Sequence, residues 1–389
     1  MTASTDLSVS SGRPEQPLGP LWRAEATAAQ RRSLPAGTVT VSCPTRVGLG
    51  GLGRHLQEIL EALAGRDDEC FCICEDPADA DAGIVGSGAR RTLELSRAAA
   101  PLTRFSPAWR MWAASISFDR DAARRLTPAE NLIAFNGTAR AQFAAAPRAG
   151  MKSHSLVSAN SHFAHVLRRH ARAQRDYPGI ERPWGTHLLR RNLAEYQRAD
   201  RIYVASNYIR ESFLQEGFDD STLSFFPLTP DPRYRPRTAP RGSSTFDIVY
   251  VGSLMVHKGV PLLVEAFSRL PHADMRLNLV GGWSTRGMRR LIERACAADS
   301  RISAGPADPL QPINTASLCV HPSYEDGFAY APAEALACGV PVLVSEDTGM
   351  KELIHEGLTG LVLPTGDSRA LAEAIDAVYR RETLDGPGT

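Results

Sequence analysis

Each half of the sequence contains a short run of β-branched and apolar residues that leads through a glycine-containing turn into a helix. The first run covers residues 38–43 and the second covers residues 246–251. Further strand-like and helical runs alternate after each of them. Such alternation is typical of a parallel sheet with helices on both faces, because parallel strands are joined by long crossover connections. The sequence therefore predicts an α/β protein.

The alternating runs divide into expected strands and expected helices. Strands are expected at residues 38–43, 70–74, 132–135, 155–157, 201–205, 246–251, 276–280, 318–320, 340–344 and 361–363. Helices are expected from about residue 54, and over residues 207–215, 261–270, 288–297 and 367–381. In the first of these helices, apolar residues recur at helical spacing.

A proline-rich stretch separates the two halves of the chain. At 389 residues the chain exceeds a typical single domain. Residues 226–245 contain five prolines and a Gly-Ser-Ser sequence, which is typical of a linker. We predict two Rossmann-like domains, residues 37–225 and residues 246–389, facing each other across a cleft. Residues 1–36 are predicted to be a disordered or loosely attached tail, with a short helix near residues 21–32.

Composition excludes several classes of protein. The net charge of +1 gives no argument for nucleic-acid binding, and no apolar run of eighteen residues is present. No secretory signal is expected at the N-terminus, and seven cysteines fit a reducing cytoplasm. Cys70, Cys72 and Cys74 would share one face of a strand, as in a metal site. No second Cys or His cluster has zinc-finger spacing, so packing is the favoured interpretation.

The turn after the first strand is rich in glycine. Gly48, Gly50 and Gly53 match the dinucleotide-binding pattern G-x-G-x-x-G, and Glu75 follows about where a ribose-binding acid is expected. Glycines let backbone N–H groups approach an anion at the start of a helix. The pattern is short, and the additional Gly51 also suits a tight turn with no ligand. A nicotinamide-dependent dehydrogenase is therefore one hypothesis.

Two acids stand eight positions apart between two of the expected strands of the second half. These are Asp326 and Glu334. A turn and a short helix are expected between the strands, with Pro332 at the first position of the helix and Gly339 at its end. Asp326 is placed in the turn and Glu334 in the first helical turn. Both acids should therefore lie at the carboxyl edge of the sheet, where open α/β folds bind ligands.

Arginine-rich segments stand out in the first half. Residues 104–125 combine arginines with two tryptophans and a methionine, and residues 168–201 hold nine more arginines against four acids. Either segment could contact an anionic acceptor or a membrane surface. Solvated helix faces with buried tryptophans are the simpler interpretation. Asp79-Ala-Asp81 resembles a metal-binding DxD pattern, but its Ala/Asp-rich surroundings favour a solvated turn.

Four stretches together resemble the retaining glycosyltransferases of family four, which have the GT-B fold. They are residues 50–55, 251–266, 321–342 and 344–361. The resemblance extends over residues 38–380. It implies that residues 37–225 form the acceptor-side domain and residues 246–389 the nucleotide-sugar-binding domain. It implies transfer of a sugar from a nucleotide-sugar to a hydroxyl acceptor, with retention of configuration at the anomeric carbon. It also implies that no metal or other cofactor is needed. The expected location is the cytoplasm, and peripheral contact with the inner face of a membrane is one option.

The same resemblance assigns roles to individual residues. Lys258 would stabilise the leaving diphosphate, Glu334 would accept both ribose hydroxyls, and Asp326 would hold the transferring sugar. Many relatives have Glu at this last position, so the neighbouring Glu325 is an alternative. His162 matches a histidine near the acceptor, although a structural histidine fits equally well. The expected donor-binding residues are Gly50, Gly51, Gly53, Ser253, His257, Lys258, Glu325, Gly327, Phe328, Ala329 and Glu334.

The sequence also departs from the family pattern. Ser253 stands where many relatives have arginine, and His257 could replace that charge in part if it were protonated. The chain stops soon after Arg381, whereas relatives often continue in a long helix. These departures suggest an alternative, a catalytically weak or inactive homologue that binds a nucleotide-sugar as a partner protein. The nucleobase, the sugar and the acceptor are not predicted.

Overall fold

The computed structural model describes residues 20–65, 69–75, 90–91, 107–182, 184, 186–236 and 245–384. The described chain divides into two compact units. One, here called the first-sheet unit, contains residues 24–168 and 184–229. The other, the second-sheet unit, contains residues 169–182 and the chain from 230 onward, together with residues 20–23. Asp79, Asp81 and most of the predicted tail lie outside the described residues.

The first-sheet unit contains a parallel sheet in the order β3-β2-β1-β4-β5-β6-β7. Its strands are β1 (Val39–Ser42), β2 (Cys70–Cys74), β3 (Arg90–Arg91), β4 (Asn131–Phe135), β5 (Ser153–Ser158), β6 (Arg201–Val204) and β7 (Leu223–Phe225). Its helices are α1 (Pro20–Ser33), α2 (Gly50–Ala64), α3 (Pro107–Arg124), α4 (Arg140–Ala145), α5 (Phe163–Asp176), α6 (Thr186–Tyr196) and α7 (Asn207–Leu214). The first residues of α1 and the last residues of α5 belong to the second-sheet unit.

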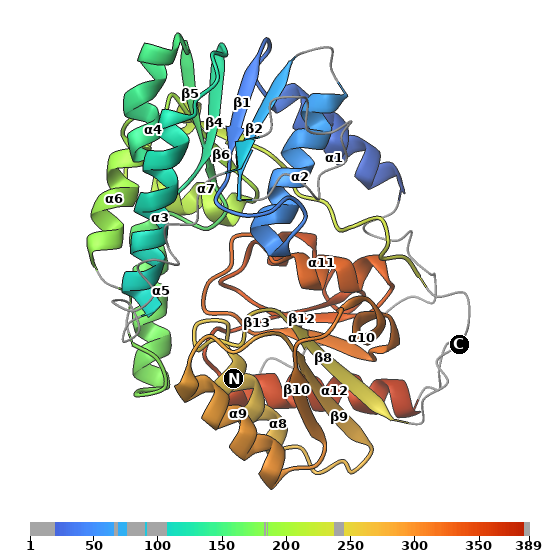
Figure 1. Cartoon of the computed structure of the whole chain (residues 1–389). Helices are drawn as coiled ribbons and strands as arrows, with labels where there is room; N and C mark the ends of the chain where they lie inside the picture. Colours follow the sequence, from blue (N-terminus) through green and yellow to red (C-terminus); the bar gives the residue numbers. More distant parts are fainter. Residues whose placement is uncertain are drawn as a thin grey trace. The chain divides into compact units, whose positions relative to one another are not determined.

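The second-sheet unit contains a parallel sheet in the order β10-β9-β8-β11-β12-β13. Its strands are β8 (Phe246–Val251), β9 (Met275–Val280), β10 (Ile302–Gly305), β11 (Leu318–His321), β12 (Val342–Ser345) and β13 (Gly360–Leu363). Its helices are α8 (Val260–Ser268), α9 (Arg286–Ala298), α10 (Leu310–Thr315), α11 (Tyr330–Ala337) and α12 (Ser368–Leu384). In Figure 1, α8, α9 and α12 cover one face of this sheet, and α11 covers the other.

Both sheets have the doubly wound arrangement, so the prediction of two Rossmann-like α/β domains is confirmed. In each sheet the strand order reverses beside the first strand, between β1 and β4 in one and between β8 and β11 in the other. Ligands of open α/β sheets bind outside the carboxyl ends of the strands at such a reversal. In the second-sheet unit, the loops after β8 and β11 carry Lys258 and Asp326.

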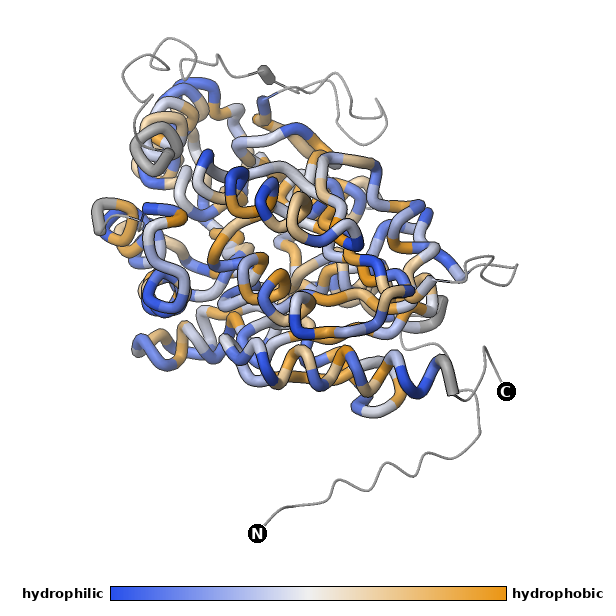
Figure 2. Tube along the Cα trace, turned by 90° about the horizontal axis from the view of Figure 1, so that it is seen from below, coloured by the Kyte–Doolittle hydropathy of each residue, from blue (hydrophilic) through white to orange (hydrophobic). Residues whose placement is uncertain are grey.

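Apolar side chains hold each helix on its sheet. The core of the second-sheet unit combines the inward residues of β8 and β9 with buried residues of α8, α9 and α12. Hydrophobic and hydrophilic residues alternate along the helices in Figure 2, as expected of helices that cover a sheet with one side. The run of buried residues in β8, β11 and β12 fits strands covered on both faces.

A short piece from the middle of the sequence completes the second-sheet unit. Residues 169–182, here called the inserted segment, comprise the end of α5 and the chain that follows it. Ala173 lies in the apolar core together with Phe267 and Leu371, and Tyr177 and Ile180 pack against that core. The sequence had assigned this segment to the first domain.

Two helices begin elsewhere than the sequence predicted. Helix α2 begins at Gly50, about four residues early, so its glycines lie within the first helical turns. Helix α11 begins at Tyr330, which makes Pro332 its third residue and moves Glu334 to the second turn. Proline at the third position is tolerated because the first N–H groups of a helix have no partner within it. Gly339 follows α11 with a φ of 77°, as expected.

Candidate functional site

Lys258 and Asp326 are brought together although 68 residues separate them. The Lys258 Nζ donates to Asp326 Oδ2 at 2.8 Å and to the Glu325 carbonyl at 3.1 Å. The two loops are also joined through the His257 carbonyl, which accepts the Tyr324 N–H at 2.7 Å. The expected phosphate-binding lysine and the expected sugar-binding acid are therefore one ion pair at the strand-order reversal.

Asp326 is held on several sides. Its Oδ2 also accepts a hydrogen bond from His321 Nε2 at 3.0 Å, and its backbone N–H and carbonyl bond to Asp347 and Gly349. Burial alone would raise the pKa of Asp326, but Lys258 and His321 together hold it well below the usual value. The carboxylate is therefore ionised, oriented and matched by two donors. His321 was not among the predicted site residues, because it is the last residue of an apolar strand.

Glycine is required directly after Lys258. Gly259 has a φ of 73°, and a Cβ there would lie 1.9 Å from the Pro322 carbonyl oxygen. The close approach brings the loop after β8 against the loop after β11. Gly259 is also the residue before α8, which has no side-chain N-cap. The first N–H groups of α8 therefore begin immediately behind Lys258 and can favour negative charge.

The loop before α11 is strained. Ala329 has a φ of 67°, the one positive value among the described residues other than glycine. Such a conformation costs about 1–3 kcal/mol and is characteristic of ligand sites. Ala329 is the N-cap position of α11 but supplies no side-chain cap, and the ring of the preceding Phe328 meets that of Tyr330 edge to face. Gly327 is buried in the same loop.

Glu334 and Glu325, the other two acids considered for the site, have different surroundings. The Glu334 side chain is close enough to Tyr234 and Cys319 to raise the pKa of each, in addition to the effect of burial. Glu325 is 1% exposed, and its carbonyl accepts from both Lys258 and Ser323. Of the two neighbouring candidates, Asp326 therefore has the carboxylate in the charged cluster, while Glu325 contributes its backbone to it.

Ser253 and His257 do not supply the missing positive charge. Ser253 is exposed, and its carbonyl accepts a hydrogen bond from Tyr250. His257 is buried and stacks on His170 with ring centroids 3.8 Å apart. Burial, together with the nearby His170 and Lys258, lowers the pKa of His257 well below its usual value. The idea that a protonated His257 replaces an arginine is therefore wrong at neutral pH.

The glycine-rich turn lies in the first-sheet unit, after β1. The Gly48 N–H donates to the Gly53 carbonyl at 2.8 Å, so it is used within the turn. A Cβ on Gly53 would lie 2.2 Å from the Arg46 carbonyl oxygen, which explains glycine at that position. Gly50 has a φ of 62° and open space around it. These features match the tight turn considered from the sequence, and Gly50 and Gly51 leave the start of α2 accessible.

His162 is enclosed by aromatic side chains in the first-sheet unit. Its ring packs against Tyr196, Phe213 and Phe218 and is 1% exposed. Burial lowers the pKa of His162 from 6.5 to about 4, so the ring is uncharged at neutral pH. This environment favours a structural role over the catalytic role expected from the sequence.

Replacing His162 by phenylalanine should therefore leave turnover nearly unchanged and make the protein more resistant to acid. The neutral ring contributes stability above pH 6.5, which is lost as the pH falls towards the folded pKa of about 4. The variant should gain on the wild type by up to about 1.4 kcal/mol per pH unit in this range. Urea unfolding between pH 7 and pH 4 measures the difference. Loss of turnover without the pH effect would restore the catalytic assignment.

A buried charge network was missed in the first-sheet unit. It surrounds the loop after β4, at the strand-order reversal. Glu195 accepts backbone N–H groups of Gly137, Ala139 and Arg140, while Asp119 accepts two from the next residues of α4. Arg191 lies between the two carboxylates. Asp119, Arg191 and Glu195 lie in helices α3 and α6 that carry other charged residues, so the sequence gives no signal that sets them apart.

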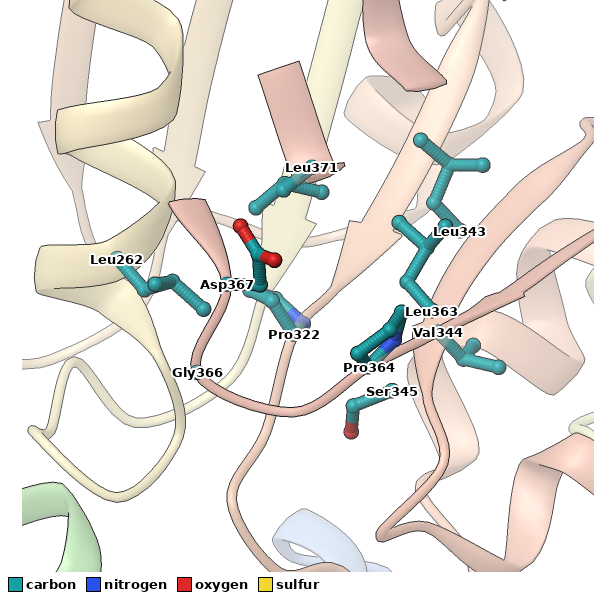
Figure 3. Close-up of a pocket in the computed structure, with 10 residues that line it drawn as sticks. All are labelled: Leu262, Pro322, Leu343, Val344, Ser345, Leu363, Pro364, Gly366, Asp367 and Leu371. Carbon is teal, nitrogen blue, oxygen red and sulfur yellow. The ribbon is translucent and has the colours of Figure 1, made fainter. Parts of the chain in front are cut away.

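The described residues also include free cysteines and a small pocket. Burial raises the pKa of Cys70 to about 12, and no group of His, Cys, Asp and Glu in the described chain could hold a metal ion. A small pocket in the second-sheet unit, shown in Figure 3, lies near the ends of β12 and β13. Apart from Ser345 and Asp367 its lining side chains are apolar, and it contains neither Lys258 nor Asp326.

Comparison with known families concerns the unit that carries this ion pair. Residues 245–381 match the family described as glycosyl transferases group 1. The match includes the loops of Lys258, Asp326 and Glu334. The second half of the chain is therefore similar to a glycosyltransferase domain.

Curated relatives agree over the same portion of sequence. The chain is 31% identical over 144 residues to the D-inositol 3-phosphate glycosyltransferase of Nocardia farcinica, which is 34% of this chain and 32% of the relative. It is 26% identical over 147 residues to the capsular polysaccharide biosynthesis glycosyltransferase CapM of Staphylococcus aureus, covering 36% of this chain and 39% of CapM. The chain thus spans less than two fifths of the length of these relatives.

Solved structures resemble nearly the whole chain. Sucrose-phosphate synthase of Thermosynechococcus elongatus matches with a TM-score of 0.68 at 20% identity, over 88% of this chain and 90% of the synthase. HepE of Anabaena in complex with UDP-glucose matches with a TM-score of 0.63 at 16% identity, over 90% and 91%. At this identity the likeness shows the fold, which is GT-B.

Proposed function

We propose that the protein is a retaining, metal-independent glycosyltransferase that moves a sugar from a nucleotide-sugar to a hydroxyl acceptor. The observation that carries the proposal is the Lys258–Asp326 pair at the strand-order reversal of the second-sheet unit. The match of residues 245–381 to glycosyl transferases group 1 supports it. HepE, of the same fold, has been solved with UDP-glucose. The sequence match gives no comparable support to the dehydrogenase hypothesis.

In this proposal Lys258 stabilises the negative charge of the departing diphosphate. The bond that breaks joins the anomeric carbon to a phosphate oxygen, and charge develops on that oxygen. An ammonium group and the free N–H groups at the start of α8 would stabilise it without a metal. Helix α11 begins directly after the strained Ala329 without a side-chain cap, and the first N–H groups of a helix have no partner within it.

The acids would orient the donor. Glu334 binds the ribose hydroxyls, and Asp326 orients the transferring sugar once the diphosphate has engaged Lys258. His321 then remains as the hydrogen-bond partner of Asp326. Attack on the same face, with the departing phosphate oxygen taking the acceptor proton, retains the configuration. Positioning of the two substrates is the main contribution to the rate.

A ligand screen tests this function directly. Thermal unfolding is measured with UDP-, GDP-, ADP- and dTDP-sugars, each with and without EDTA. A donor at 100 times its Kd should stabilise the native state by about 2.7 kcal/mol, which raises the Tm by a few degrees. Slow hydrolysis of the same donor, unaffected by EDTA and initially giving the retained anomer, is expected.

The other outcomes separate the alternatives. Binding with no hydrolysis and no transfer to any acceptor would favour a nucleotide-sugar-binding partner protein. Absence of both binding and hydrolysis would contradict the proposal. The acceptor site is assigned to the first-sheet unit, where the arginines of α3 and α6 suit an anionic acceptor or contact with an acidic membrane surface. Within the described chain, no helix has both the length and the apolar character needed to cross a bilayer.

A further inference from the structure

We propose that the inserted segment, residues 169–182, holds the loops of Lys258 and Asp326 in register, with Arg169 and Glu181 as positioning residues. The inference rests on the proposed function, since it names residues that act through the catalytic pair. The segment belongs to the second-sheet unit although it comes from the first half of the chain. None of its residues was among the predicted catalytic or donor-binding residues, although it lies within the arginine-rich segment 168–201 considered for acceptor contact.

Glu181 fixes the start of the Lys258 loop. Its Oε2 accepts the Val256 N–H at 3.1 Å, and the Val256 carbonyl accepts the Gly259 N–H at 2.9 Å. The other oxygen of Glu181 accepts the hydroxyl of Ser284, in the loop after β9. One carboxylate therefore connects two loops at the carboxyl edge of the sheet and holds the turn from which Lys258 projects.

His170 supports the same loop from another side. Its ring stacks on His257, the residue before Lys258, with an angle of 24° between the ring planes. Burial, with a contribution from Lys258, lowers the pKa of His170 to about 3, so both rings are neutral. A stacked pair of uncharged rings adds packing to the loop without competing for the charge of Lys258.

Arg169 holds the Asp326 loop through Asp347. The Arg169 Nη2 lies 2.7 Å from Asp347 Oδ1, and the Asp347 side chain is 4% exposed. The Asp347 carbonyl accepts the Asp326 N–H at 3.1 Å, and Gly349 donates back to the Asp326 carbonyl at 3.0 Å. An ion pair with a buried partner thus fixes the backbone on which the Asp326 carboxylate is carried.

The remainder of the segment is anchored to neighbouring elements. Asp176 accepts the hydroxyl of Tyr324 at 2.7 Å, two residues before Asp326. Tyr177 donates to Glu265 of α8 at 2.7 Å, and Arg172 donates to the Thr365 carbonyl after β13. The segment therefore contacts the chain after each of β8, β9, β11, β12 and β13. Such a set of contacts suits a brace across the loops of the site.

The consequence for catalysis is positional. Lys258 and Asp326 lie on separate loops, and their 2.8 Å contact depends on the relative position of those loops. A displacement of about 1 Å in a catalytic group can lower the rate about 100-fold. Arg169 and Glu181 touch neither group directly, so their effect should appear in the rate of the chemical step more than in donor affinity.

The test uses the full chain with Arg169→Gln and Glu181→Ala. Each should lower kcat about tenfold or more, with the KM for the donor within about threefold of the wild type. Arg169→Lys and Glu181→Gln, which keep the charge and the acceptor oxygen respectively, should recover most of the rate. Arg175→Gln is the matched control, because Arg175 is exposed on the same helix. It should behave as the wild type.

Amide hydrogen exchange of the unliganded protein provides a second readout that does not depend on turnover. Exchange at Val256 should rise in Glu181→Ala, and exchange at Asp326 should rise in Arg169→Gln, with no change in Arg175→Gln. Unchanged exchange, or wild-type kcat in both variants, would overturn the inference. If the wild type itself binds and hydrolyses no donor, the proposed function fails, and the exchange result still decides whether the segment holds the two loops.

Discussion

Lys258→Met should lower kcat/KM for the donor about 100- to 1000-fold, the usual cost of removing one group that stabilises developing negative charge. Methionine keeps much of the length and apolar volume of the side chain but cannot neutralise the diphosphate. Asp326 would keep His321 as a partner, so the second-sheet unit should still fold. Initial rates at saturating and limiting donor, together with circular dichroism, measure the two effects separately.

A matched substitution shows whether the loss is specific. Lys152→Met removes an exposed lysine whose only described ion pair is with Glu130 on the surface. It should leave turnover at the wild-type level, since exposed ion pairs contribute little. If Lys258→Met retained more than about a third of the wild-type rate, the diphosphate would have to be stabilised elsewhere. The proposed mechanism would then be wrong.

Arg191→Met should destabilise the first-sheet unit by about 3–5 kcal/mol. The guanidinium pairs with Asp119, lies 3.3 Å from Glu195 and donates to the Gly137 carbonyl at 2.6 Å. Removal of the arginine leaves two buried carboxylates without a cation. The expected result is a large fall in the urea midpoint of this unit.

The pH dependence and a neighbouring arginine provide the controls for this effect. Burial raises the pKa of Glu195 to about 7, so its contribution is retained at low pH and falls as the pH rises from 4.5 through 7. The deficit of Arg191→Met should therefore be greater at pH 8 than at pH 6. Arg190→Met, one position earlier and exposed, should change stability by less than about 0.5 kcal/mol. Equal stability of the two variants would show that the network is not important for folding.

The buried strands could be predicted from the sequence because parallel strands covered on both faces are continuous apolar runs. The predicted limits of β2 and β8 agree with the structure. The edge strands β3, β7 and β10 were missed, since they are short or polar. The early start of α2 was missed because its first residues are glycines, which normally disfavour a helix.

The residue types of the site were predictable, but their contacts were not. Lys258, Asp326 and Glu334 follow from local motifs, whereas the positive φ of Ala329 has no signal in the residue itself. His321 was hidden in an apolar strand. The inserted segment could not be found because its bonds to Val256 and Tyr324 span 75 and 148 residues. Such pairs leave no periodicity in the sequence.

The second-sheet unit combines residues 169–182 with the chain from residue 230 onward, and this affects the order in which it can fold during synthesis. The ribosome releases residues 169–182 well before β8 and the five strands that follow it exist. Until then Ala173, Tyr177 and Ile180 have no core to enter. The second-sheet unit can therefore complete its core only after residue 245 and the later strands have been synthesised, although residues 169–182 are made earlier. A fragment that begins at residue 245 would lack this piece, and it should be less stable and less soluble than the same residues in the whole protein.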